Sequence, residues 1–124
     1  MKEKYIRLRA NLPPDIVEID SENLLQEFYK AIDCDCIETC RVYDDLEDIR
    51  LIIDESGKLK NCPFNPLASI IYGGDLEADY IAGTALVACI GERNGETDLV
   101  PLGEALTEAI YDGLTAVWNH IHRS

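Results

Sequence analysis

Apolar and polar residues alternate near the N-terminus, and this pattern predicts a β-hairpin. Ile6 to Ala10 alternate between apolar and basic side chains, and a period of two places the apolar ones on one face of a strand. Pro13-Pro14-Asp15 then turns the chain, because proline fixes its own φ and restricts the residue before it. Ile16 to Ile19 form the second predicted strand.

Apolar residues at steps of three and four predict two main helices. The first spans about residues 21–32, with Asp20 or Ser21 as its N-cap. The second spans residues 102–121 and carries one continuous apolar stripe. The stripe consists of Leu102, Leu106, Ile110, Leu114, Val117 and Ile121. A helix of this length is expected to pack across a sheet or against a second copy of itself.

The middle of the chain predicts a second antiparallel hairpin. Residues 37–43 and 49–53 are its two strands, joined by the acidic turn at residues 44–48. Glu55 to Lys58 form another turn, in which Gly57 can take a positive φ. Residues 59–62 are expected to continue the sheet briefly.

The next segment combines a short helix with a long core strand. Asn65 is a suitable cap for a helix over residues 66–72, with Pro66 at the first position. Gly73-Gly74 ends that helix. Residues 80–90 predict a strand that Gly83 interrupts, and residues 91–97 predict a polar turn.

These elements predict a single α+β domain that covers residues 1–124. Its sheet is small, mixed and mainly antiparallel, and it packs against the two main helices, near residues 21–32 and 102–121. A length of 124 residues lies in the range of one compact domain. No apolar run approaches the roughly 18 residues that would span a bilayer, and no signal peptide is recognised. A cytoplasmic location is therefore expected.

The net charge restricts the partners. With 24 acidic residues against 11 basic ones the formal net charge is −13, which repels phosphate backbones and anionic lipids. Direct binding to nucleic acid or membrane is therefore not expected. The charge serves solubility, or it fits a protein partner with a basic surface. A homodimer is a further expectation.

The five cysteines are expected to be free thiols. Their odd number, the lack of a CxxC pair and the lack of an export signal argue against disulfides. Cys34, Cys36, Cys40 and Cys62 lack the paired spacing of a structural zinc site. Cys34, Cys36 and Cys40 share one parity, so on a strand they lie on one face as small apolar groups. No metal and no cofactor are expected.

No catalytic group is assigned. His120 and His122 are two positions apart near a helix end, where they act as helix-end cations rather than as a metal-binding pair. The acidic residues Asp44, Asp45, Glu47 and Asp48 lack the pattern of a calcium loop and are expected to form a solvated turn.

Two turns and one strand are the candidate ligand-binding region. The stretch from Asp79 to Thr84 carries a glycine inside a strand, which marks a bulge or a close backbone approach, with a hydroxyl beside it. Together with the Gly57-Lys58 turn it is expected to line a small polar pocket. The candidate residues are Gly57, Lys58, Asn65, Tyr80, Gly83 and Thr84. A kinked core strand is the structural alternative.

Three stretches of the chain resemble one family. They are Val17-Glu18-Ile19-Asp20, then residues 52–59 (IIDESGKL) followed by Asn65, and residues 79–85 (DYIAGTA). Their order and spacing resemble the uncharacterised bacterial and phage "domain of unknown function 3846" family. The chain departs from that family at Asn65-Pro66, where an arginine often follows the asparagine. The resemblance implies a small accessory factor of phages, conjugative elements or bacteria, and it implies no catalytic residue.

The sequence therefore predicts an accessory protein that acts by binding, as an acidic protein–protein inhibitor or adaptor. Two alternatives stay open. One is a small-molecule or nucleotide sponge, with its pocket near Gly57 and Gly83. The other is an enzyme whose site is not recognised.

Overall fold

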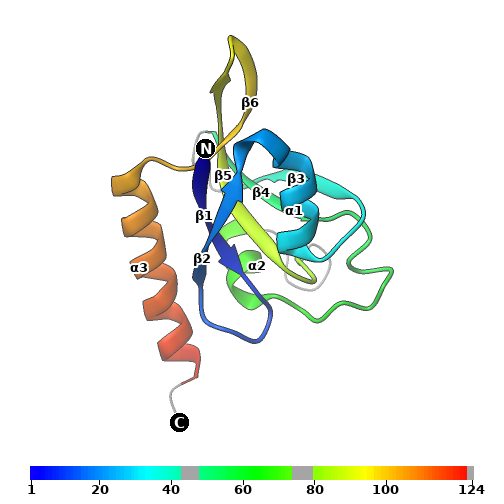
Figure 1. The fold of residues 1–124 in the computed structure, drawn as a ribbon. Coiled ribbons are helices and arrows are strands. Elements are labelled where there is room, and N and C mark those ends of the chain that lie inside the picture. Colours follow the sequence, from blue (N-terminus) through cyan, green and yellow to red (C-terminus); the bar gives the residue numbers. More distant parts are fainter. Residues whose placement is uncertain (43–47, 74–79, 123–124) are drawn as a thin grey trace.

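The computed structural model describes residues 1–42, 48–73 and 80–122, which form a six-stranded sheet and three α-helices (Figure 1). The strands are β1 (Lys2–Leu8), β2 (Asp15–Asp20), β3 (Ile37–Arg41), β4 (Ile49–Asp54), β5 (Ala85–Arg93) and β6 (Glu96–Val100). The helices are α1 (Leu24–Ile32), α2 (Pro66–Tyr72) and α3 (Glu104–Ile121), and a 3₁₀ turn, η1 (Ser21–Asn23), precedes α1. The predicted α+β fold is confirmed.

All of these strand pairs are antiparallel, and β5 lies at the centre of the sheet. The strand order is β2-β1-β5-β4-β3, with β6 paired to β5. Cys89 of β5 pairs with Ile49 of β4 on one side and with Val100 of β6 on the other. β6 therefore takes the side of β5 that β1 occupies further along. The β5–β6 hairpin projects beyond the rest of the sheet (Figure 1).

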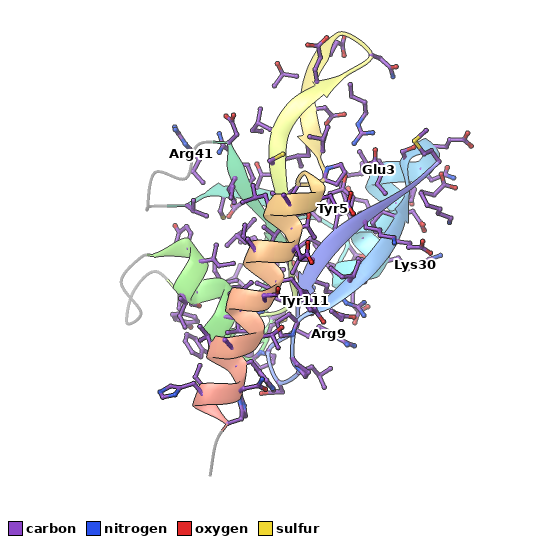
Figure 2. The ribbon with its side chains drawn as sticks, turned by 90° about the vertical axis from the view of Figure 1, so that its left-hand side faces the viewer. Glu3, Tyr5, Arg9, Lys30, Arg41 and Tyr111 are labelled. Atoms are coloured by element: carbon purple, nitrogen blue, oxygen red, sulfur yellow. The ribbon has the colours of Figure 1, made fainter. Side chains whose placement is uncertain are left out.

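The helices cover both faces of the sheet, so the core has two layers. Side chains alternate along each central strand. Ile6, Leu51 and Val87 face α2 and α3 in one cluster, which includes Leu67 and Leu114. Their neighbours in sequence face α1 in the other cluster, whose members are Tyr5, Ile19, Phe28, Ile32, Ile52, Leu86 and Ala88. Figure 2 shows α3 lying in front of the sheet on the first of these faces.

Most predicted elements are present, with shifted ends. The first strand runs over Lys2–Leu8 rather than 6–10, because its partner β2 pairs with it as far as Lys2. Asp20 caps η1 by accepting a hydrogen bond from the Glu22 amide. The hairpin of β3 and β4 is confirmed, while residues 43–47 of its predicted acidic turn lie outside the described part.

The predicted strand at 80–90 and the predicted turn at 91–97 are both wrong in extent. β5 begins only at Ala85 and continues to Arg93, and residues 80–84 contribute one isolated bridge, Ala82 with Phe64. The turn is confined to Asn94-Gly95, where both residues have positive φ. This is the two-residue hairpin turn whose twist matches that of its strands.

The brief strand expected at residues 59–62 is also wrong. The chain there forms consecutive turns, in which the amides of Asn61 and Cys62 bond back to the carbonyls of Lys58 and Gly57. Asn61 has a φ of 58°, a left-handed conformation that short polar side chains tolerate. The segment therefore folds on itself, and its apolar residue Leu59 stays outside the core.

The predicted C-terminal helix is confirmed as α3, which packs across the sheet through Leu114 and neighbouring half-buried side chains. His120 lies in its last turn, and His122 stacks on Trp118 at a centroid distance of 3.6 Å. No helix among the described residues has the length and apolar character needed to cross a membrane.

An ion pair fastens the projecting β5–β6 hairpin to β1. Arg93 donates to both carboxylate oxygens of Glu3, at 2.8 and 3.0 Å, and also to the Leu99 carbonyl at 2.8 Å. The guanidinium hydrogen bond holds the pKa of Glu3 below its ordinary value, although partial burial opposes this. Bidentate pairs of this kind are among the stronger charge-assisted bonds.

Replacing Glu3 with Gln is expected to lower the unfolding free energy at pH 7 by about 1–2 kcal/mol. Because the pKa of Glu3 is lowered in the folded state, this contribution is complete above the ordinary value of 4.5 and is lost as the pH falls through the lowered pKa. Urea unfolding at pH 7 and at pH 3 measures it. Glu96→Gln, at an exposed site of the same hairpin, is the control and should differ little from wild type at either pH.

Candidate binding site

The structure brings the predicted turn and the predicted strand stretch into direct contact. A Cβ placed on Gly57 would lie 2.7 Å from the Ala82 carbonyl oxygen, so only glycine allows this approach. The Lys58 Nζ lies 4.5 Å from the centre of the Tyr80 ring, within the range of a cation–π contact. Gly57, Lys58 and Tyr80 therefore belong to one site.

Asn65 connects the Gly83 stretch with the end of β1 and the first turn of α2 from inside the core. Its side chain is 0% exposed, and Nδ2 donates to the carbonyls of Leu8 and Gly83, each at 2.8 Å. Its Oδ1 accepts from the Ala68 amide at 3.1 Å and so caps α2, as the sequence predicted. With these bonds made, Asn65 positions the site and does not line its pocket.

Three of the candidate residues line a small hollow that we call the Tyr80 pocket. Its volume is about 160 Å³. It lies beside the end of β4 and is lined by Glu38, Cys40, Ile53, Asp54, Glu55, Gly57, Lys58, Leu59, Tyr72, Tyr80, Ile81 and Ala82. Cavities of about 150 Å³ hold a single benzene ring, whereas pockets for drug-sized ligands span about 300–1,000 Å³. The Tyr80 pocket therefore suits one ring-sized group.

Exposed apolar side chains flank the Tyr80 pocket. Leu59 is 87% exposed and Phe64 is 45% exposed. The Phe64 ring packs edge-on against the Tyr80 ring at a centroid distance of 5.7 Å. An aromatic and aliphatic patch of this kind, next to a pocket, is typical of interaction surfaces.

Asp54, the last residue of β4, lines the Tyr80 pocket and holds the turn that follows it. Its side chain is 5% exposed and forms an ion pair with Lys60 at 2.5 Å. Its Oδ1 also accepts from the Ser56 amide at 2.9 Å. The hydrogen bond to Asp54 raises the pKa of Lys60. Asp54 is therefore paired, and its contacts hold the 54–60 turn in shape.

Gly83 and Thr84 line a separate hollow. Its volume is about 300 Å³, and Asp54 borders both hollows. Gly83 has a φ of 86°, which favours glycine, and a Cβ there would lie 3.3 Å from the Cys62 Cβ. The six candidate residues therefore lie together but do not form one pocket.

A wider groove of about 780 Å³ lies between β1 and the first half of α3. Lys2 and Lys4 border it on one side, and Glu104 and Glu108 on the other. Charges of both signs face each other across it, and none of the sequence candidates borders it. It is secondary to the Tyr80 pocket, which gathers three of the sequence candidates beside the exposed side chains of Leu59 and Phe64.

The cysteines do not form a common site. Cys34 packs against the α1-side cluster and Cys40 against the opposite one. The prediction that they share a strand face is wrong, because Cys34 precedes β3. Burial raises the pKa of the Cys34 thiol, and a hydrogen bond to Glu55 raises that of Cys36. Among the described residues, no group of three or more His, Cys, Asp or Glu can hold a metal ion.

Sequence reasoning missed several lining residues. Cys40 and Tyr72 line the Tyr80 pocket from β3 and from the end of α2. The sequence predicts that Leu59, between Lys58 and Lys60, belongs to a strand, whereas it lines the pocket from a turn. An apolar residue inside a turn is itself an indication of a binding surface. Tyr72 showed no such indication.

The described residues thus define a small antiparallel sheet domain with an aromatic-rimmed pocket near one sheet edge. The chain belongs to the family described as Domain of unknown function (DUF3846), which matches residues 1–112. The predicted family is confirmed. Neither a curated protein nor a solved structure matches the chain.

Replacing Asn65 with Ala should lower the unfolding free energy by about 3 kcal/mol, because it leaves two carbonyls and one amide without partners in the core. Asn23→Ala is the matched control, since Asn23 stands at the start of α1 without a side-chain capping bond. Urea unfolding of both variants measures the difference. If both variants lose the same small amount of unfolding free energy, the role of Asn65 is contradicted.

Proposed function

We propose that this protein acts by binding another protein, as an inhibitor or adaptor, and that the Tyr80 pocket receives one side chain of that partner. The observation that carries the proposal is a ring-sized pocket beside exposed Leu59 and Phe64. Binding energy in protein interfaces concentrates on a few anchor side chains that fill such pockets.

The charge of the chain supports a basic partner. A net charge of −13 steers cationic surfaces toward the protein and repels anionic ones. Around the pocket, Glu38 and Glu55 are exposed carboxylates. The proposed partner therefore presents an apolar or aromatic anchor among basic residues.

The same dimensions disfavour a nucleotide sponge with its pocket near Gly57 and Gly83. The Tyr80 pocket is about half the volume at which drug-sized pockets begin. The neighbouring hollow of about 300 Å³ is larger, but the exposed carboxylate of Asp33 lines it and would repel a phosphate. Arg9, which also borders it, already forms an ion pair with Asp15 at 3.3 Å.

The proposed setting follows from the family resemblance and the thiols. We place the protein in the cytoplasm of a bacterium, as an accessory factor of a phage or mobile element. None of the five cysteines, all of which lie in the described residues, forms a disulfide, which fits a reducing compartment.

Selection of a random peptide library on the immobilised protein tests the proposal. Enriched peptides should carry one large apolar anchor flanked by Lys or Arg, and their affinity should fall as salt screens the charges. Leu59→Ala and Tyr80→Ala should each weaken binding by about tenfold or more. Fluorescence anisotropy with a labelled peptide measures the change.

Leu106→Ala is the matched control, because Leu106 is an exposed apolar residue on α3, 44% exposed, and it does not line the Tyr80 pocket. Its affinity for the peptide should equal that of wild type. Circular dichroism establishes that each variant is folded. Failure to enrich any peptide, together with a thermal shift on adding a nucleotide, would overturn the proposal in favour of the sponge.

A further inference from the structure

β3 stands at one end of the sheet, and half of its backbone groups point away from β4. The Glu55 amide bonds to the Cys36 carbonyl, so residues 36 and 55 form a hydrogen-bonded pair. Bonded and non-bonded pairs alternate along an antiparallel ladder. Glu38 and Cys40 therefore bond to β4, while the N–H and C=O groups of Ile37, Thr39 and Arg41 face the outer edge.

This edge is open within the described part of the chain. β4 is the strand paired with β3 in the described residues, and β3 is the last strand of the order. Glu38, Thr39 and Arg41 are all exposed. Figure 2 places Arg41 on the far side of the sheet from β2. Unpaired edge groups of this kind are a template for another strand.

The same edge borders the Tyr80 pocket. Glu38 and Cys40, two residues apart on β3, both line it. Side chains at alternate positions of neighbouring strands point to the same face. A strand added about 4.8 Å outside β3 would place its own alternate side chains beside those of Glu38 and Cys40, next to the mouth of the pocket.

The charges around the start of β3 favour a partner strand with basic side chains. Asp35, Glu38 and Glu55 are exposed there, and Arg41 stands at the other end. Basic side chains opposite Asp35 and Glu38 would be attracted, and acidic ones repelled. The opposite edge strand, β2, has beside it a hollow in which Arg7, Glu18, Glu27 and Lys30 supply charges of both signs and no aromatic ring.

We infer that β3 accepts an additional antiparallel strand from a partner protein, an extended basic segment whose large apolar side chain enters the Tyr80 pocket. This inference rests on the proposed function and specifies how its partner binds. Main-chain hydrogen bonds to the edge supply affinity, and the pocket supplies specificity, as in other cases of strand addition. The antiparallel direction follows the strand pairs observed in the sheet.

Residue-resolved hydrogen exchange on the unaltered protein, with and without a selected peptide, tests this geometry. The amides of Ile37, Thr39 and Arg41 should exchange at least about tenfold more slowly when the peptide is bound, because each gains a hydrogen-bond partner. The amides of Glu38 and Cys40 already face β4 and should change less. Protection without this alternation would overturn the inference.

N-methylation of the peptide is a second test on the unaltered protein. Methyl groups on alternate peptide nitrogens should abolish binding in one register and leave it nearly unchanged in the other. Equal effects at all positions would overturn strand addition.

A proline scan of the edges separates this inference from the proposed function. Thr39→Pro removes an outward N–H and leaves the bonds to β4 in place, so it should weaken peptide binding by about tenfold or more. Glu18→Pro is the matched control on β2, where the Ser21 amide bonds to the Met1 carbonyl and so places the Glu18 amide on the outer side. If Leu59→Ala weakens binding and Thr39→Pro does not, the pocket is supported and strand addition is overturned. If neither variant weakens binding, the proposed pocket and strand addition are both overturned.

Discussion

The three hydrogen bonds of the Asn65 side chain are the interaction on which the site depends. They connect the end of β1, the Gly83 turn and the first turn of α2, three segments that are distant in the sequence. A buried amide with all of these bonds made contributes specificity as well as stability, because no apolar residue could replace it without leaving partners unsatisfied. Two of the segments that line the pocket, α2 and residues 80–82, are held together through this side chain.

Close backbone contact completes the site. Because Gly57 has no side chain, the 54–60 turn lies directly on the Ala82 carbonyl, and this brings Lys58 over Tyr80. The ion pair between Asp54 and Lys60 connects the two ends of the same turn. Hydrogen bonds and an ion pair thus hold one side of the binding surface, which presents Leu59 to solvent.

Local patterns predicted most of the fold, and long-range contacts account for what they missed. The hairpin of β1 and β2, the Asn65 cap and α3 all follow from turn chemistry and apolar period. The end of β5 did not, because Asn94-Gly95 is a hairpin signal only if the polar residues on both sides are recognised as paired strands. The candidate residues Gly57, Lys58 and Tyr80 were brought together as expected. Tyr72 and Cys40 entered the pocket through tertiary packing, which one sequence does not encode in a local pattern.

The central place of β5 has a consequence for synthesis of the chain. β5 is the strand to which β1, β4 and β6 all bond, and it follows both early hairpins in the sequence. During translation the two early hairpins, β1–β2 and β3–β4, have no sheet to join until β5 leaves the ribosome. Pairing across such sequence separation is intrinsically slow, so a nascent chain carries unpaired strand edges until β5 has been made. Such edges are prone to aggregation, and chaperone binding at this stage would protect the chain.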